Sequence, residues 1–223
     1  MTDDVMRVRI ETRSGNVRLE AVEGAALEVH GGEVREERDG TTLVKGGSRK
    51  LEVVVPSGAD VTIGTHSGSV ELHGWFGSAR IATKSGSIEV DRAHAVDART
   101  ASGSVRVERC DGECRVVVVS GSVKIGRAGR ASLACVSGSI EAGHVDDAEV
   151  KNVSGTTELG ANATGRITVR SVSGKVKINV PSDRSPATSL KSVSGKIRCE
   201  CDQGHDGEVD VKTVSGTIQV ACD

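Results

Sequence analysis

The chain has 223 residues, a formal net charge of −2 and two aromatic residues, Trp75 and Phe76. A nearly neutral charge provides no general attraction to nucleic acid or to an anionic membrane surface. No apolar run reaches membrane-spanning length, and residues 1–20 lack the apolar core of a signal peptide. As written, the chain is therefore expected in the cytoplasm, with the cell surface as the alternative if an upstream segment is missing.

Along the chain, the dominant feature is a Ser-Gly dipeptide that recurs at nearly regular intervals. The serines lie 17 or 18 residues apart between Ser67 and Ser154, and the interval then widens to 19 and 21 residues. Such a period indicates a stack of similar structural units. The dipeptides begin at Ser14, Ser67, Ser85, Ser102, Ser120, Ser137, Ser154, Ser173, Ser194 and Ser215.

Each repeat alternates apolar or small residues with polar ones on both sides of the dipeptide. The apolar positions lie six, four and two residues before the serine, and three and five residues after it. A period of two on both sides of a glycine predicts a strand, a turn and a strand. The glycine is expected at positive φ. Around Ser85 the inward residues are Ala79, Ile81, Thr83, Ile88 and Val90, and the same offsets hold around Ser67, Ser102 and Ser215.

Residues 1–60 are predicted to form degenerate N-terminal coils. Gly31-Gly32 takes the place of Ser-Gly in one of them, with Ala25, Leu27 and Val29 before it and Val34 after it. Gly46-Gly47 marks a looser match, followed by Leu51, Val53 and Val55.

These patterns predict an all-β, single-domain parallel β-solenoid, or β-helix, over residues 1–223, with the regular Ser-Gly coils at 61–223. We expect about 11–12 coils, each of roughly 17–21 residues. Each strand should pair in parallel with its copy one coil away, so that equivalent residues form ladders. Parallel crossovers favour a right-handed coil. A β-sandwich is disfavoured because its strands share no common register.

Two outward ladders are candidate interaction surfaces. Two arrangements accommodate the first ladder: a bend that places its valines in a corner of the core, which we favour, or an exposed apolar stripe that binds a partner. The second ladder is basic and suits a polyanion or an acidic partner, or it keeps the face soluble. The valine ladder, one residue before the serine, is Val119, Val136, Val153, Val172, Val193 and Val214; the basic ladder, three residues before it, is Lys151, Arg170, Lys191 and Lys212.

The six cysteines are predicted to be reduced and to lie in or near the core, because no secretion signal is visible. Cys201 and Cys222 share an offset from their serines and are expected to be ladder neighbours. Cys199, Cys201 and His205 form an incomplete set for zinc, which usually takes four ligands. We therefore predict no metal and no cofactor.

We predict no catalytic residues. Catalysis by paired acids needs a pocket that holds them at a fixed distance, and small uniform coils provide shallow faces instead. Only the longer coils near residues 181–189 and 201–208 could shelter a site. The candidates there are Asp183, Asp202, His205 and Asp206.

The sequence also resembles a known family. Leu-Glu-Val-Val-Val-Pro-Ser-Gly-Ala-Asp-Val-Thr-Ile at 51–63, followed by Thr-x-Ser-Gly-Ser-Val-Glu-Leu at 65–72, resembles the putative adhesin family of bacterial β-strand repeat proteins, a domain of unknown function. The resemblance covers nearly the whole chain and implies a β-solenoid with no established catalytic residues. In architecture alone, the short coils are also similar to those of bactofilins, which build filaments.

We therefore expect a non-enzymatic structural or binding module, an adhesin-like rod whose repeated face meets a protein or polymer partner. The alternative is a self-assembling, bactofilin-like filament or scaffold subunit, because neither end shows a capping helix and unpaired strands associate readily. A polysaccharide-acting enzyme is the weakest alternative. Homo-oligomers are expected through an open end or through the valine ladder, and no specific nucleic acid partner is expected.

Overall fold

The protein is all-β, as predicted. The computed structural model describes residues 5–162 and 165–222, and no helix occurs within those ranges; accordingly, none there has the length and apolarity to cross a bilayer. The strands form one 14-stranded sheet. They are β1 (Arg7–Ser14), β2 (Val17–Val22), β3 (Glu28–His30), β4 (Gly32–Glu36), β5 (Thr41–Gly46), β6 (Leu51–Pro56), β7 (Asp60–Ser67), β8 (Val70–Ser85), β9 (Ile88–Ser102), β10 (Val105–Ala161), β11 (Arg166–Val180), β12 (Ala187–Ser194), β13 (Ile197–Cys199) and β14 (Glu208–Cys222).

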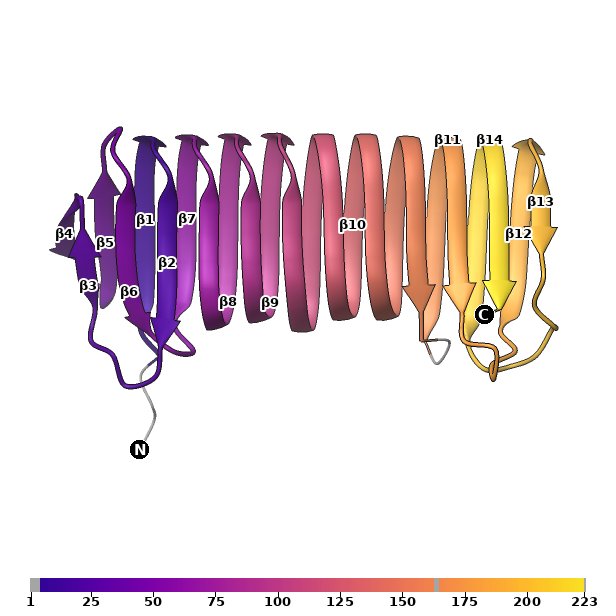
Figure 1. Ribbon diagram of the computed structural model, residues 1–223, viewed down its shortest axis with the longest axis horizontal. Helices are drawn as coiled ribbons and strands as arrows, with labels where there is room; N and C mark the ends of the chain where they lie inside the picture. The colour runs from indigo at the N-terminus through magenta and orange to yellow at the C-terminus, as the bar shows by residue number, and fades with distance from the viewer. Residues whose placement is uncertain (1–4, 163–164, 223) are drawn as a thin grey trace.

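The strands lie side by side along one long axis, and β10 winds around that axis several times (Figure 1). From β7 to β11 each strand pairs in parallel with the next one in sequence. The register matches Ser67 with Ser85, Ser85 with Ser102, and Ser102 with Ser120. The Ser-Gly period therefore sets the pairing register of the central part of the molecule.

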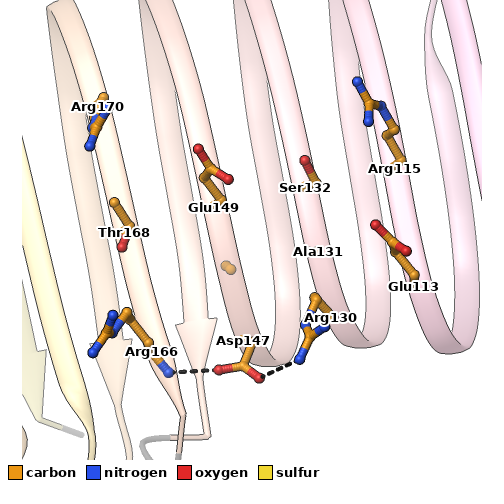
Figure 2. Close-up of a pocket in the computed structure, with 11 residues that line it drawn as sticks. Glu113, Arg115, Arg130, Ala131, Ser132, Asp147, Glu149, Arg166, Thr168 and Arg170 are labelled. Atoms are coloured by element: carbon orange, nitrogen blue, oxygen red, sulfur yellow. Dashed lines mark hydrogen bonds and ion pairs between the residues drawn. The ribbon is translucent and has the colours of Figure 1, made fainter.

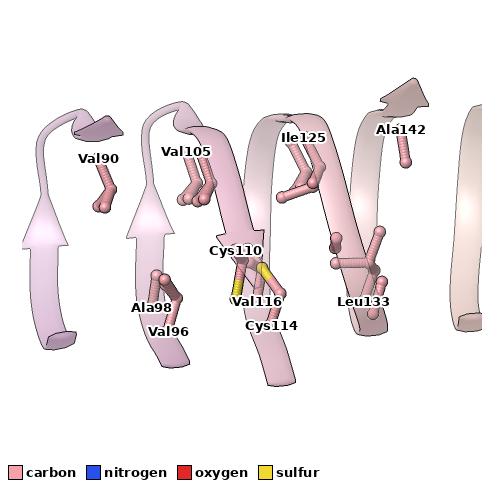
Figure 3. Close-up of a cluster of buried hydrophobic side chains, with 14 of the residues drawn as sticks. Val90, Val96, Ala98, Val105, Cys110, Cys114, Val116, Ile125, Leu133 and Ala142 are labelled. Atoms are coloured by element: carbon pink, nitrogen blue, oxygen red, sulfur yellow. The ribbon is translucent and has the colours of Figure 1, made fainter. Parts of the chain in front are cut away.

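The core is a continuous strip of small and branched side chains inside the stack. The residues at the predicted inward offsets are buried around Ser67, Ser85, Ser102 and Ser215, so this prediction is confirmed. Figure 3 shows such side chains from successive repeats, among them Val105 and Ile125, directed into the interior. β-Branched residues suit this position because they pack well on a pleated surface.

The N-terminal end differs from the prediction. Gly31-Gly32 does not mark a degenerate coil, because β3 pairs antiparallel with β6 and β4 pairs antiparallel with β5. Val34 is 49% exposed and not part of the core. The sheet is therefore mixed, where the sequence predicted parallel pairing throughout. Leu51, Val53 and Val55 are buried as predicted.

The order of strands in space departs from the order in sequence at both ends. β1 lies between β5 and β7, with Ser14 matched to Ser67. At the other end β14 lies between β11 and β12. The outermost repeats are consequently internal segments of the chain, and each terminal repeat is enclosed by two neighbours.

The cysteines fall into three groups. Cys110, Cys114 and Cys135 are free and buried, as predicted. The prediction was wrong for the others: Cys201 and Cys222 form a disulfide bond, and Cys199 is free but exposed. The shared offset brings Cys201 and Cys222 together because the repeat of β14 stacks directly on that of β13.

Reducing the Cys201–Cys222 bond is expected to destabilise the C-terminal repeats by about 3 kcal/mol, because the bond closes a loop of 21 residues that the unfolded chain would otherwise leave open. Thermal melts with and without a phosphine reductant would measure the effect. Cys199→Ser, which removes the exposed free thiol, should melt like the wild type and keep the response to reductant. Identical wild-type melts under both conditions would contradict the prediction.

Candidate functional site

One face of the molecule carries both ladders that the sequence singled out. Positions one and three residues before each serine belong to the same strand and differ by two residues, so their side chains point to the same side. In the structure these ten side chains are all exposed, and they come from β10, β11, β12 and β14. The structure therefore brings both predicted ladders onto a single face, which we call the interaction face.

The valines form an exposed apolar stripe, so the favoured corner interpretation was wrong. Alternation continues up to the serine, and the residue two before it, such as Cys135 or Asn152, takes the interior position. We call this stripe the Val row. In spatial order it is Val119, Val136, Val153, Val172, Val214 and Val193; the first five are 46–52% exposed and Val193 is 85% exposed.

A shallow apolar groove of about 400 Å³ runs beside the Val row. Four valines of the row line it, together with Val117 and Ala134. These two short side chains occupy the register that carries long cationic side chains in the following repeats, so the face is hollowed there. Cys135 lies beneath the groove, and burial raises the pKa of its thiol. The groove is thus an apolar surface without an accessible reactive thiol.

The four cations of the basic ladder stack in register, and we call them the basic row. Lys151 pairs with Arg170, Arg170 with Lys212, and Lys212 with Lys191. Adjacent members are about 5 Å apart because that is the spacing of paired strands. Their mutual repulsion favours acidic groups nearby or on a partner.

Two members of the basic row have acidic partners in the chain. Lys151 Nζ lies 2.7 Å from Glu149 Oε1, and Lys212 Nζ lies 2.9 Å from Asp210 Oδ2. The hydrogen bond from Lys151 lowers the pKa of Glu149. Within the described ranges, Arg170 and Lys191 make no salt bridge. The uncompensated charge of the row is therefore concentrated on these two residues.

A second groove, of about 720 Å³, adjoins the first at Arg170 (Figure 2). It is open and shallow, and the small side chains of Ala131, Ser132 and Thr168 form its floor. Around them stand four arginines, Arg115, Arg130, Arg166 and Arg170, and three carboxylates, Glu113, Asp147 and Glu149.

Asp147 links two of these arginines. Its Oδ1 accepts a hydrogen bond of 2.8 Å from the Arg166 backbone N–H, and its Oδ2 lies 3.9 Å from Arg130 Nη2. Arg115 and Arg170 stand at opposite ends of the groove (Figure 2). Sequence reasoning missed this groove because its arginines lie three, five and seven residues before their serines, so no single register reveals them.

The predicted catalytic candidates lie in exposed loops, where two of them have structural partners. Asp206 Oδ2 accepts a hydrogen bond of 3.0 Å from the Ser185 backbone N–H, which ties the two loops together. Asp183 Oδ2 lies 3.8 Å from Arg184 Nε. In the part of the chain that the structure describes, no group of three or more His, Cys, Asp or Glu side chains could hold a metal ion.

Comparison with known proteins bears on the fold and the family of the chain. A putative adhesin from Bacteroides fragilis has a crystal structure that is 16% identical to this chain, with a TM-score of 0.52 over 98% of this chain and 93% of that one. The likeness shows the fold alone. A putative cell adhesion protein from Clostridium sporogenes is 7% identical over 99% of this chain and 95% of its own, and its TM-score of 0.24 supports no argument. No curated protein matches the chain significantly.

The family model described as Toastrack DUF4097 matches residues 2–222. This match covers almost the whole length, including both ladders, and agrees with the resemblance carried by residues 51–72. The chain therefore belongs to the Toastrack DUF4097 family, a family of unknown function.

Proposed function

We propose that the protein is a non-enzymatic binding module, in which a single adhesin-like β-solenoid presents the interaction face to a protein or polymer partner. The solenoid has about 11–12 coils and is right-handed, because parallel crossovers favour that hand. The parallel registers from β7 to β11 support this description. The family and the fold of the Bacteroides fragilis neighbour are consistent with it.

The observation that carries the proposal is the half-exposed Val row beside its groove. Exposed apolar patches that extend over several repeats mark sites of association. The basic row runs alongside, so a partner that combines apolar groups with acidic groups fits the face best. A partner that follows the long axis can repeat one contact on each coil, which increases its avidity without any single strong contact.

Changing Val153 and Val172 to lysine together is expected to reduce capture of the partner at least tenfold, because removing two apolar contacts of about 1 kcal/mol each has roughly that effect. Fold stability should change by less than about 1 kcal/mol, since both side chains are half exposed. Immobilised wild type and variant would be incubated with an extract of the native cell, and each captured protein or polymer quantified.

The matched control is Val22→Lys, which makes the same chemical change at a valine that is 40% exposed and lies outside the Val row. A partner specific to the face should be captured equally by this control and the wild type. Equal capture by the double variant and the wild type would refute the proposal, and unfolding of the double variant would show that the row belongs to the core.

The Cys201–Cys222 disulfide provides information on the cellular compartment of the protein. Disulfide bonds persist in oxidising compartments and are rare in the cytosol. The Cys201–Cys222 bond therefore favours an extracytoplasmic location, such as the cell surface, over the cytoplasm expected from residues 1–20.

Our proposal includes no catalysis. Both grooves lie on an open sheet face, whereas acid–base chemistry requires groups held in a site that excludes some water. Self-assembly is the second candidate function, and the observation that favours it is that β12 and β13, at one end of the stack, pair with β14 on one side only among the described strands.

A further inference from the structure

The two ends of the stack are built differently, and the N-terminal end is closed. The outermost parallel repeat there is β5 and β6, yet its inward residues Val44 and Leu51 are 0% and 1% exposed. They are covered because β3 and β4 add an antiparallel layer beyond them, with β3 paired to β6 and β4 paired to β5. Gly32 lies so close that an added Cβ would be 2.8 Å from Leu51 Cδ1. The edge strand β4 is exposed along its whole length and carries Glu33, Arg35 and Glu36.

The C-terminal end is open. Its outermost strands are β12 and β13, and among the described residues only β14 pairs with them. Leu190 points inward but is only partly buried, and Ile197, also inward by its offset, is 43% exposed. The high exposure of Val193 has the same cause, because no further repeat covers its outer side. The core therefore ends on an uncovered apolar layer.

The free edge of β12 offers main-chain hydrogen-bonding groups. Ala187 N–H donates to Gly207 O at 2.9 Å, so Ala187 and alternate residues after it face β14. The residues between them, Thr188, Leu190 and Ser192, direct their N–H and C=O groups away from the sheet. Within this set the Thr188 N–H already has a partner, since Gln203 Oε1 accepts from it at 3.3 Å and the Gln203 amide donates to Thr188 Oγ1.

We propose that β12 pairs antiparallel with β12 of a second copy of this chain, around a twofold axis at Leu190. In this register Leu190 meets its own copy, and Thr188 lies opposite Ser192 of the second copy. The N–H and C=O groups of all these residues point away from β14 and toward the second copy, while their side chains point into the core. Hydrogen bonding and core packing are therefore satisfied together.

Neighbouring registers are worse for identifiable reasons. Moving the axis to Lys191 would place two lysines directly opposite each other, which is destabilising. Moving it to Ser189 would place Ser192 opposite Pro186, which has no N–H to donate. With the axis at Leu190, Lys191 lies opposite Ser189. The sequence of β12 is therefore self-complementary in one register.

The asymmetry of the two ends limits the assembly to two copies. The closed end presents β4, where Glu33, Arg35 and Glu36 flank the exposed Val34, and charged edges oppose strand pairing. Once two open ends meet, the complex has a closed twofold symmetry and no open end remains. The structure thus favours a tail-to-tail dimer over the filament suggested by the likeness to bactofilins. The dimer leaves the Val row available, so it does not rest on the proposed function.

Sedimentation velocity at roughly 1–100 μM, a range suited to micromolar affinity, would test the dimer. We expect a wild-type dimer, a monomer for Leu190→Asp, and a dimer for the control Val34→Asp at the closed end. The double change of Val153 and Val172 to lysine should also remain dimeric. A monomeric wild type, species larger than a dimer, or loss of the dimer in either control would overturn the proposal.

A second variant keeps the test valid if Leu190→Asp fails to fold. Gln203→Ala removes the side chain that competes for Thr188, so it should tighten dimerisation by about twofold to tenfold, the effect of one net hydrogen bond. Unchanged or weaker dimerisation would overturn the proposed register. In addition, a short bis-maleimide should link two wild-type copies through Cys199, the exposed free thiol of the described chain, and should not link Cys199→Ser.

Discussion

Replacing Val105 with aspartate is expected to lower the melting temperature by more than about 10 °C, or to prevent folding. Val105 is 1% exposed and pairs with Ile88 in the preceding repeat. Burying a carboxylate there leaves a charge without a partner, which costs several kcal/mol even if the group becomes protonated. Val105 lies near the middle of the continuous stack, so local unfolding at this position would separate the repeats on either side. Circular dichroism melts would measure it.

Glu89→Lys is the control for Val105→Asp. Glu89 is the outward neighbour of Ile88, and its only ion pair in the described ranges is a long one, 3.9 Å from Arg106 Nε to Glu89 Oε1. Reversing this charge should change stability by less than about 0.5 kcal/mol. Equal melting temperatures for the two variants would show that the inward register is wrong.

Replacing Gly138 with alanine is expected to destabilise the protein by about 3–5 kcal/mol, through backbone strain and overpacking together. Gly138 has a φ of 148°, in the region that side chains rarely adopt. An added Cβ would also collide with the carbonyl oxygen of Gly121 in the preceding repeat. Main chain meets main chain there, so no side-chain rotation relieves the clash. Urea unfolding of the variant would give the change in free energy.

The matched control is Gly64→Ala in β7. A Cβ at Gly64 would have Ile10 O as its nearest atom, at 4.0 Å, and its φ lies outside the left-handed region. Stability should stay constant or rise by up to about 1 kcal/mol, because alanine reduces the freedom of the unfolded chain. If both glycine variants unfolded at the same urea concentration, close stacking of the Ser-Gly turns would be disproved.

The sequence was most informative where one repeat follows another. The offsets around Ser85 identified buried residues correctly because a period of two leaves one choice of inward face. Gly31-Gly32 misled the prediction for a physical reason: glycine marks a close approach of chains as well as a turn, and Gly32 packs against Leu51. The pairing partners of the strands at the two ends of the stack could not be predicted from the spacing of the Ser-Gly dipeptides. This spacing gives the order of the repeats along the chain and not their order in space.

The candidate site was predictable in part. Both ladders followed from a constant offset before the serine, while exposure of the Val row depends on whether the strand bends, which no residue pattern specifies. The arginine groove stayed hidden because residues from different offsets, such as Arg115 and Arg166, converge only after stacking. The Cys201–Cys222 bond was missed because the expected compartment was inferred from residues 1–20.

The position of β14 between β11 and β12 has a consequence for synthesis. A ribosome releases residues 187–199 before residues 208–222, yet among the described strands β12 and β13 pair only with β14. Growth of the stack therefore cannot follow the order of translation in this region. The repeat of β14 must enter between two earlier ones, and until it does, β12 and β13 lack the strand with which they pair in the finished structure.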